Sequence, residues 1–310
     1  MADAGVSRRD VRFRSGEGEC GGWLFLPAGA ANDSPLPIVL LGHGLAGLKS
    51  QRLDSFAQRF AERGYAALAF DYRHFGSSTG EPRQLADVEE QLEDWRSAVA
   101  YARTLEGIDP RRVILWGTSF AGGHVITTAA GDPGIAAAIA QCPFSDGLAA
   151  ARAMPKKTII RLMREALKDR KAANRNEPPV RVPIVGLPGD LAVMTSPDSV
   201  SGLRAIFDAS GEPFEIPEIP ARFMFQVPVY RPGRGASAVK APLLVCVCER
   251  DKVTPARQTE QLASRAARGE VKRYDASHFD IYVGDWFERV VADQIEFLER
   301  HVPVEATAVR

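Results

Sequence analysis

The chain has 310 residues, and its 39 lysines and arginines balance 39 aspartates and glutamates. Hydrophobic residues make up 45% and charged residues 25%, as in ordinary globular proteins, so disorder is excluded as the main state. The net charge of zero argues against a dedicated nucleic-acid-binding protein, which carries a basic excess. The first ten residues lack the apolar segment of a signal peptide, and we expect a cytoplasmic protein.

The N-terminal half alternates between short apolar runs and amphipathic segments. A hairpin is expected first, with strands at 11–14 and 23–26 joined by a turn. Further strands are predicted at 37–41, 65–70, 112–116 and 135–141, and helices at 50–63, 87–105 and 119–130. This alternation predicts an α/β fold, in which helices flank both faces of a mostly parallel sheet.

The alternation breaks in the segment 145–239. Eleven of the 21 prolines lie between 178 and 242, and proline lacks the N–H that a central strand must donate. Helices are expected within this segment at 156–172 and 199–207. We interpret the segment as an inserted, mainly helical cap.

The α/β pattern then resumes up to the C-terminus. Strands are predicted at 243–248 and 271–274, and helices at 255–267 and 286–301. The expected organisation is therefore one core, built from 1–144 and 240–310, interrupted by the cap at 145–239.

The sharpest local signal is the motif from Gly117 to Ala121, which follows an apolar strand and opens a helix. A tight strand-to-helix turn needs small residues two positions before and two after its middle residue, and Gly117 and Ala121 meet this need. Such a turn raises the Ser119 hydroxyl above the sheet at a helix N-terminus, where negative charge is favoured. We predict that Ser119 is a nucleophile; the alternative is a simple helix N-cap.

A serine nucleophile needs a base, and the chain offers five histidines. His278 lies just beyond the last strand, at the carboxyl end of the sheet, where ligands bind in open α/β folds. We therefore predict His278 as the base, against the alternative of a surface-loop histidine. His124 is expected to be a packing residue, His74 lies in a loop, and His301 is expected to face solvent at the end of the last helix.

The base needs a carboxylate to orient it. Asp251 follows the strand 243–248 and is also expected at the carboxyl end of the sheet. Glu249 is the rival acid, but it leaves the strand two residues earlier. A surface charge is the other interpretation of Asp251.

The loop after the first parallel strand, Gly42-His43-Gly44-Leu45, is a candidate oxyanion hole. Its glycines let the backbone turn toward the reacting centre. The backbone N–H groups of Leu45 and Phe120 would then converge on a developing negative charge. We expect Gly44 and His43 to support this loop, and an ordinary turn is the alternative.

These four elements resemble the α/β-hydrolase superfamily, in which Ser, Asp and His follow one another in this chain order. The stretch from Asp71 to Ser78, followed by Glu81-Pro82, is similar to dienelactone-hydrolase-like and polyketide-transferase-like members. The resemblance implies hydrolysis of carboxylic esters through an acyl-enzyme, with no cofactor and no metal. Members with a cysteine or aspartate nucleophile are disfavoured because Ser119 fills that position.

Two other functions remain open at this point. An acyltransferase or thioesterase would use the same base and differ only in the fate of the acyl group. A non-catalytic binding protein on the same scaffold is a third alternative, although such proteins usually lose a triad residue and all three positions are filled here. The oligomeric state is undetermined, with a homodimer left open.

The predicted cap is rich in large apolar residues, which suggests an apolar ester or acyl substrate. These residues are Met154, Met163, Phe207, Phe214, Phe223, Met224, Phe225 and Tyr230. Packing of the cap onto the core explains them equally well. The segment 156–175 carries eight basic and two acidic residues. It is interpreted as a solvated face, a dock for an acidic acyl carrier or coenzyme phosphate, or a membrane-surface helix.

The cysteines do not suggest a disulfide framework, because there are only four in 310 residues. Cys246 and Cys248 fall on one face of a predicted strand, and we expect buried free thiols there. A zinc site would need further ligands at suitable spacing, and none follows them.

Overall fold

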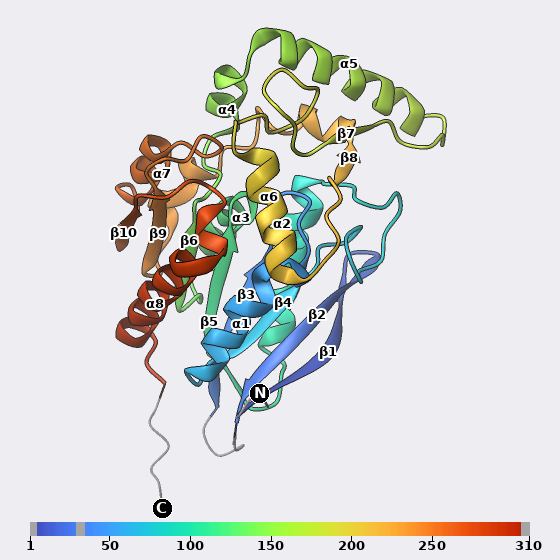
Figure 1. The fold of residues 1–310 in the computed structure, drawn as a ribbon. Helices are drawn as coiled ribbons and strands as arrows, with labels where there is room; N and C mark the ends of the chain where they lie inside the picture. The colour runs from blue at the N-terminus through green and yellow to red at the C-terminus, as the bar shows by residue number, and fades with distance from the viewer. Residues whose placement is uncertain (1–4, 29–34, 305–310) are drawn as a thin grey trace, which may run out of the picture.

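The computed structural model describes residues 5–28 and 35–304, and within them eight strands form one sheet (Figure 1). The strands are β1 (Val6–Ser15), β2 (Gly18–Pro27), β3 (Leu36–Gly42), β4 (Ala66–Phe70), β5 (Ile108–Thr118), β6 (Ala137–Gln141), β9 (Leu243–Cys248) and β10 (Gly269–Tyr274). Their order across the sheet is β1-β2-β4-β3-β5-β6-β9-β10. Within this eight-stranded sheet only the β1/β2 and β2/β4 pairs are antiparallel. The predicted mostly parallel α/β sheet is confirmed.

Helices cover both faces of this sheet (Figure 1). They are α1 (Asp54–Glu62) and α8 (Gly284–His301) on one face, and α2 (Val88–Ala102), α3 (Phe120–Gly131) and α7 (Ala256–Ala263) on the other. Strand β3 explains the two cores: Ile38 and Leu40 point into one, while Val39 and Leu41 point into the other. A strand that is apolar at successive positions is suited to a sheet buried on both sides.

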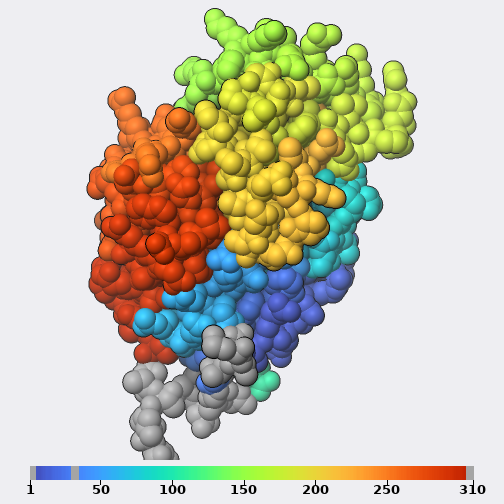
Figure 2. All heavy atoms as spheres, in the orientation of Figure 1, coloured from blue at the N-terminus to red at the C-terminus, as the bar shows by residue number. Residues whose placement is uncertain are grey.

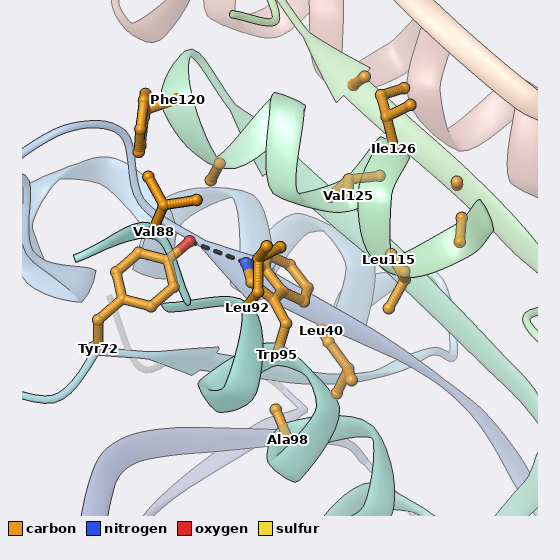
Figure 3. Packing of buried hydrophobic residues seen from close by; sticks show 14 of the residues in the cluster. Leu40, Tyr72, Val88, Leu92, Trp95, Ala98, Leu115, Phe120, Val125 and Ile126 are labelled. Carbon is orange, nitrogen blue, oxygen red and sulfur yellow. Dashed lines mark hydrogen bonds between the residues drawn. The ribbon is translucent and has the colours of Figure 1, made fainter. Parts of the chain in front are cut away.

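The core beneath α2 and α3 contains a hydrogen bond between two of its large side chains (Figure 3). Tyr72 and Trp95 are both buried, and the Trp95 indole N–H donates to the Tyr72 hydroxyl at 2.9 Å. Phe120, the first residue of α3, belongs to the same cluster. The turn before α3 is therefore adjacent to this buried cluster.

The chain between β6 and β9 lies over one end of the sheet, with α5 outermost (Figure 1). It contains α4 (Gly147–Ala153), α5 (Lys156–Ala173), α6 (Ser199–Ser210), the 3-10 turns η2 (Ala221–Phe225) and η3 (Pro232–Ala238), and an antiparallel pair, β7 (Arg181–Pro183) with β8 (Glu218–Pro220). The two helices expected from the sequence are present. The β7/β8 pair was not predicted, because strands of three residues that include proline leave little pattern. In the space-filling view this segment covers the top of the molecule (Figure 2).

The two ends of this segment lie side by side. The Gly147 N–H donates to the Tyr230 carbonyl at 3.0 Å, and Arg231 makes hydrogen bonds of 2.6 and 3.0 Å to the Asp146 carboxylate. Such hydrogen bonds between its two ends are expected of an insertion that leaves and re-enters the core at one point. The boundaries at 145 and 239 and the role of the segment as a separate cap stay predictions.

The helix expected at 50–63 begins differently in the structure. A single π-turn, η1 (Lys49–Leu53), precedes α1, and Arg52 within it has a φ of 74°. The Lys49 side chain is buried and forms an ion pair with Asp71. This long-range contact, which local periodicity does not reveal, interrupts the first helical turn.

Candidate active site

Ser119 occupies the turn between β5 and α3, with a φ of 54° and a ψ of −117°. This strained conformation is the one expected of a nucleophile held on a sharp strand-to-helix turn. The turn is tight because a Cβ on Gly117 would lie 2.4 Å from the carbonyl oxygen of Ala121. The Ser119 N–H also donates to the Gln141 carbonyl at 2.8 Å, which anchors the turn to β6.

The structure brings the three predicted catalytic residues together. Ser119 Oγ lies 3.1 Å from His278 Nε2, and His278 Nδ1 lies 2.6 Å from Asp251 Oδ2. The carboxylate accepts from Nδ1–H, so Nε2 is free to accept the serine hydroxyl proton. His278 and Asp251 are both buried. This is the arrangement of a nucleophile, a base and a group that orients the base.

The electrostatics of the pair suit this arrangement. Burial acts to lower the pKa of His278, but the Asp251 carboxylate and then Cys142 oppose it, and the pKa lies well above 6.5. Burial acts to raise the pKa of Asp251, but charge and hydrogen bonding from His278 outweigh burial and hold that pKa below its usual range. Asp251 therefore stays ionised and stabilises an imidazolium on His278.

Thr254 completes the surroundings of Asp251 and was missed by the sequence analysis. Its N–H donates to Asp251 Oδ1 at 2.7 Å, and its hydroxyl lies 2.7 Å from Asp251 Oδ2. The hydroxyl is also 3.0 Å from the Cys142 carbonyl oxygen. An aspartate followed by a threonine three residues later is a recognisable signal for a side-chain-to-backbone turn.

The predicted oxyanion loop lies against the nucleophile. A Cβ on Gly44 would be only 3.1 Å from Ser119 Cβ, so the loop backbone approaches Ser119 closely. His43 is buried, and its Nδ1 donates to the Gly44 carbonyl at 2.9 Å. Burial lowers the pKa of His43 although Asp71 opposes it, so the ring stays neutral with its proton on Nδ1. Leu45 and Phe120 both line the pocket that contains Ser119. Their role as oxyanion donors stays a prediction.

A cavity of about 580 Å³ opens above Ser119. Leu45, Phe120 and Thr254 contribute to its lower wall, and the inserted segment forms most of the rest. Of the apolar residues singled out in the sequence, Met154, Met163, Phe223 and Met224 line it. Phe207 instead packs against Phe214, with ring centroids 5.4 Å apart, and Tyr230 packs against His124. Some members of the set therefore line the cavity and others pack internally, and contact with a substrate stays a prediction.

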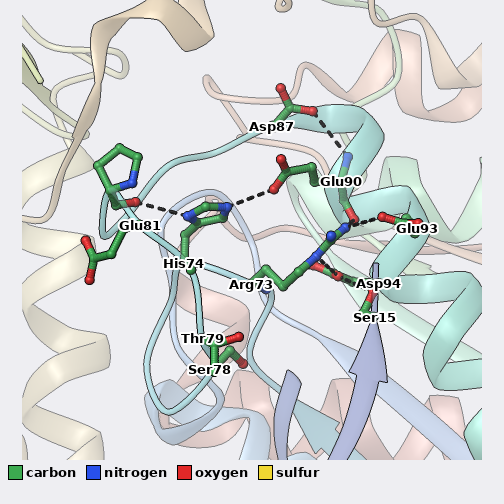
Figure 4. Close-up of polar contacts among 12 residues, drawn as sticks. Ser15, Arg73, His74, Ser78, Thr79, Glu81, Asp87, Glu90, Glu93 and Asp94 are labelled. Carbon is green, nitrogen blue, oxygen red and sulfur yellow. Dashed lines mark hydrogen bonds and ion pairs between the residues drawn. The ribbon is translucent and has the colours of Figure 1, made fainter. Parts of the chain in front are cut away.

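The other histidines lie outside the Ser119 constellation. His124 is buried between the Tyr230 hydroxyl at 2.8 Å and the Gln91 side-chain oxygen at 2.9 Å, as a packing residue should be. His74 contacts Glu90 at 2.8 Å in the loop that Arg73 ties to α2 (Figure 4). His301 was expected to face solvent; it is instead half-buried, 2.6 Å from the Glu270 carboxylate.

Within the part of the chain that the structure describes, one grouping has donor atoms that could suit a metal ion. It consists of Cys142, Asp251 and His278, whose donor atoms all lie within 4.8 Å of one another. The histidine and the carboxylate of this set already hydrogen bond to each other at 2.6 Å. The grouping therefore fits the hydrogen-bonded arrangement around Ser119 better than a metal centre. Cys246 and Cys248 are buried free thiols, as expected.

Comparison with known proteins agrees with this geometry. A family model described as serine aminopeptidase, S33, matches residues 33–183. The quorum-quenching protein AidA of Acinetobacter baumannii is 47% identical over 297 residues, which cover 96% of both chains. The thiohydrolase aneE of Aspergillus aculeatus is 30% identical over 314 residues, covering 94% of this chain and 92% of that protein.

Solved structures share the same architecture. The α/β hydrolase GrgF from a Penicillium species superposes with a TM-score of 0.81 at 23% identity, covering 96% of this chain and all of that one. Among residues 5–28 and 35–304, no helix has both the length and the apolar character needed to cross a membrane. The fold, the matched family model and the 47% identical relative together establish that this chain belongs to the α/β-hydrolase superfamily.

Proposed function

We propose that this protein is a serine hydrolase that cleaves carboxylic esters through an acyl-enzyme. Ser119 Oγ attacks the acyl carbonyl carbon while its proton passes to His278 Nε2, and Asp251 stabilises the imidazolium. The N–H groups of Leu45 and Phe120 hold the oxyanion, each contributing about 3 kcal/mol of transition-state stabilisation. The intermediate then expels the alcohol, which takes the proton from His278.

Deacylation uses the same groups in reverse. His278 accepts a proton from water, the resulting hydroxide attacks the acyl carbon, and Ser119 leaves with the proton returned by His278. Every proton that leaves a nucleophile is given to a leaving group. The chemistry needs no electron transfer and no further reactant than water.

The observation that carries this proposal is the pair of contacts made by His278, at 3.1 Å to Ser119 and 2.6 Å to Asp251. They lie at the base of an apolar cavity, which favours an ester with an apolar acyl or aromatic part. The name of the 47% identical relative, a quorum-quenching protein, adds bacterial signalling molecules to the substrates that should be tested.

The test is active-site labelling with a fluorophosphonate probe, followed by peptide mapping. We expect a single adduct on Ser119, none in Ser119→Ala, and labelling slowed by about three orders of magnitude or more in His278→Ala. Ser201→Ala is the control, because Ser201 is exposed on α6. An unlabelled wild-type protein that is folded by circular dichroism would refute the proposal.

A second candidate is a thioesterase or acyltransferase that receives its acyl group from an acidic carrier. The observation in its favour is the outer face of α5, where Lys157, Arg164 and Lys171 are exposed and, within the described residues, make no ion pair. Lys168 by contrast pairs with Glu165 at 2.8 Å. Relatives named as a thiohydrolase and a polyketide transferase also favour thioester chemistry.

Charge reversal on α5 separates the two candidates. The variant Lys157→Glu, Arg164→Glu, Lys171→Glu is compared with the wild type on one acyl group, presented either on an acyl carrier protein or on free pantetheine. If the carrier docks on α5, turnover of the carrier-bound thioester falls about tenfold or more, while the pantetheine thioester is unaffected. Equal effects on both substrates would exclude a carrier dock. Adding an alcohol acceptor and analysing the products distinguishes hydrolysis from transfer.

The control reverses a comparable set of basic residues far from α5. Arg9, Arg12 and Arg14 are exposed on β1, which lies apart from α5, below the inserted segment (Figure 1). Their reversal to glutamate changes the net charge by the same amount. Any loss that it shares with the α5 variant reports net charge rather than a docking site.

A further inference from the structure

The methionines of this chain are distributed unevenly. There are five, and apart from Met1 all lie in the inserted segment: Met154, Met163, Met194 and Met224. All four line the cavity above Ser119. The core, which supplies the triad, contains no internal methionine.

Each methionine reaches the cavity from a different element. Met154 ends α4, Met163 lies within α5, and Met224 lies in η2. Met194 lies in a loop that bridges to Val185 and is fixed by a hydrogen bond from its N–H to the Ile184 carbonyl at 2.8 Å. The backbone positions are thus held separately, and the four residues meet around the cavity.

The burial of these side chains suits a binding wall. Met224 is 7% exposed, while Met154, Met163 and Met194 are only partly buried and pack against the main core cluster. A methionine that merely filled space would be enclosed on all sides. These three have one side against protein and another toward the cavity.

Methionine differs from leucine in flexibility more than in volume. Its unbranched chain has three rotatable bonds and a polarisable sulfur, so it fits partners of different shape at low cost. Leucine and isoleucine have fewer rotamers and present a more rigid surface. A wall with four methionines can therefore rearrange around a ligand while the backbone stays in place.

We propose that Met154, Met163, Met194 and Met224 form an adaptable acyl-binding wall. It accepts apolar acyl groups of the same size but different shape, whether linear, cyclic or aromatic, at similar rates. This inference rests on the proposed ester hydrolysis and names the acyl groups that the site takes. The site then selects acyl groups by their apolar size rather than by their shape.

The test uses three nitrophenyl esters that have ten acyl carbons each: decanoyl, 4-cyclohexylbutanoyl and 4-phenylbutanoyl. The atoms next to the carbonyl are the same in all three, so intrinsic reactivity is matched. For the wild type we expect kcat/KM values within about threefold of one another. A spread beyond tenfold in the wild type would overturn the proposal.

The variant replaces all four methionines with leucine, which conserves volume and usually costs less than about 1.5 kcal/mol of stability per site. We expect the spread among the three esters to widen to about tenfold or more, because a rigid wall fits one shape best. An unchanged spread in the folded variant would also overturn the proposal. If the fourfold variant does not fold, Met163→Leu and Met194→Leu are tested singly. A widening of about threefold is expected in at least one of them, and no widening in either would overturn the proposal.

Leu162→Met is the matched control. Leu162 is fully buried in α5 beside Met163 but does not line the cavity. The exchange changes the same two residue types in the opposite direction, and we expect no change in the spread. A change as large as that in the fourfold variant would point to cap stability rather than to the wall.

Binding separates this inference from the proposed function. The dissociation constants of the three corresponding carboxylic acids are measured with Ser119→Ala, with and without the four leucines. If the wild type hydrolyses no ester, the proposed function fails, yet similar affinities that diverge in the leucine variant would still support the wall. If the affinities of Ser119→Ala for the three acids differ more than tenfold without the leucine substitutions, the proposed methionine wall is refuted.

Discussion

Replacing Gly117 with alanine tests the geometry of the nucleophile turn. The added Cβ would lie 2.4 Å from the carbonyl oxygen of Ala121 and 2.7 Å from its carbonyl carbon, against 3.4–4 Å for an ordinary contact. Both atoms belong to backbone, so no side-chain rotation relieves the clash. The first turn of α3 must move by about 1 Å relative to β5, and Ser119 connects the two elements.

Such a shift acts on activity more than on the fold. Ser119 Oγ is now 3.1 Å from His278 Nε2, and a displacement of about 1 Å in a reacting group costs roughly a hundredfold in rate. Overpacking by one methyl costs about 1–3 kcal/mol, and the backbone contact places this variant near the upper end. We expect a fluorophosphonate labelling rate at least about a hundredfold lower, with a cooperative urea transition at a lower midpoint.

Gly131→Ala is the matched control, because it lies at the other end of α3. A Cβ there meets nothing within 4 Å, and its φ is not left-handed. Labelling and stability should equal those of the wild type or better, since alanine favours helix. If Gly117→Ala is labelled at the wild-type rate, then the tight turn does not position Ser119 and the reasoning fails.

Three further outcomes follow from the polar contacts. The pKa of His278 lies above 6.5 and the neutral imidazole is the base, so kcat/KM should rise with pH through a limb above pH 6.5. Asp251→Asn should slow the reaction and move that limb to lower pH, because the variant lacks the carboxylate that raises the pKa of His278. A limb that does not move would show that Asp251 does not act on His278. Thr254→Val removes a hydroxyl that lies 2.7 Å from Asp251. We expect a loss of about 2 kcal/mol of transition-state stabilisation, measured as a tenfold or larger fall in kcat/KM. Full activity would exclude a positioning role for Thr254. Asp169 is fully buried on α5 and binds Arg222 at 2.7 Å. Asp169→Ala should therefore destabilise the inserted segment by roughly 3 kcal/mol, measured as faster proteolysis of that segment. Resistance to proteolysis equal to that of the wild type would contradict this prediction.

Prediction from the sequence succeeds where a residue's role depends on its own strand and the loop that follows. The apolar runs identify the parallel strands, and residues just after their carboxyl ends gather at one edge of the sheet. Ser119, Asp251 and His278 all follow such strands, so their proximity could be expected without knowing any side-chain contact. The 2.6 and 3.1 Å contacts of His278 further depend on the backbone turn at Ser119 and on the contacts of Thr254 with Asp251.

Prediction fails where the partner is distant in sequence and the connecting chain is irregular. The Thr254 hydroxyl donates to the Cys142 carbonyl across 112 positions. The helix expected at 50–63 begins only at Asp54, after a turn whose first residue, Lys49, pairs with Asp71. The cavity lining is a mixed case. Composition alone suggested Met154, Met163 and Met224, but it did not separate them from Phe207 and Phe214, which pack on each other, and it did not add Met194. The candidate catalytic residues could therefore be predicted from strand ends in this fold. The inserted segment supplies most of the cavity lining, and only the three-dimensional structure brings those side chains together.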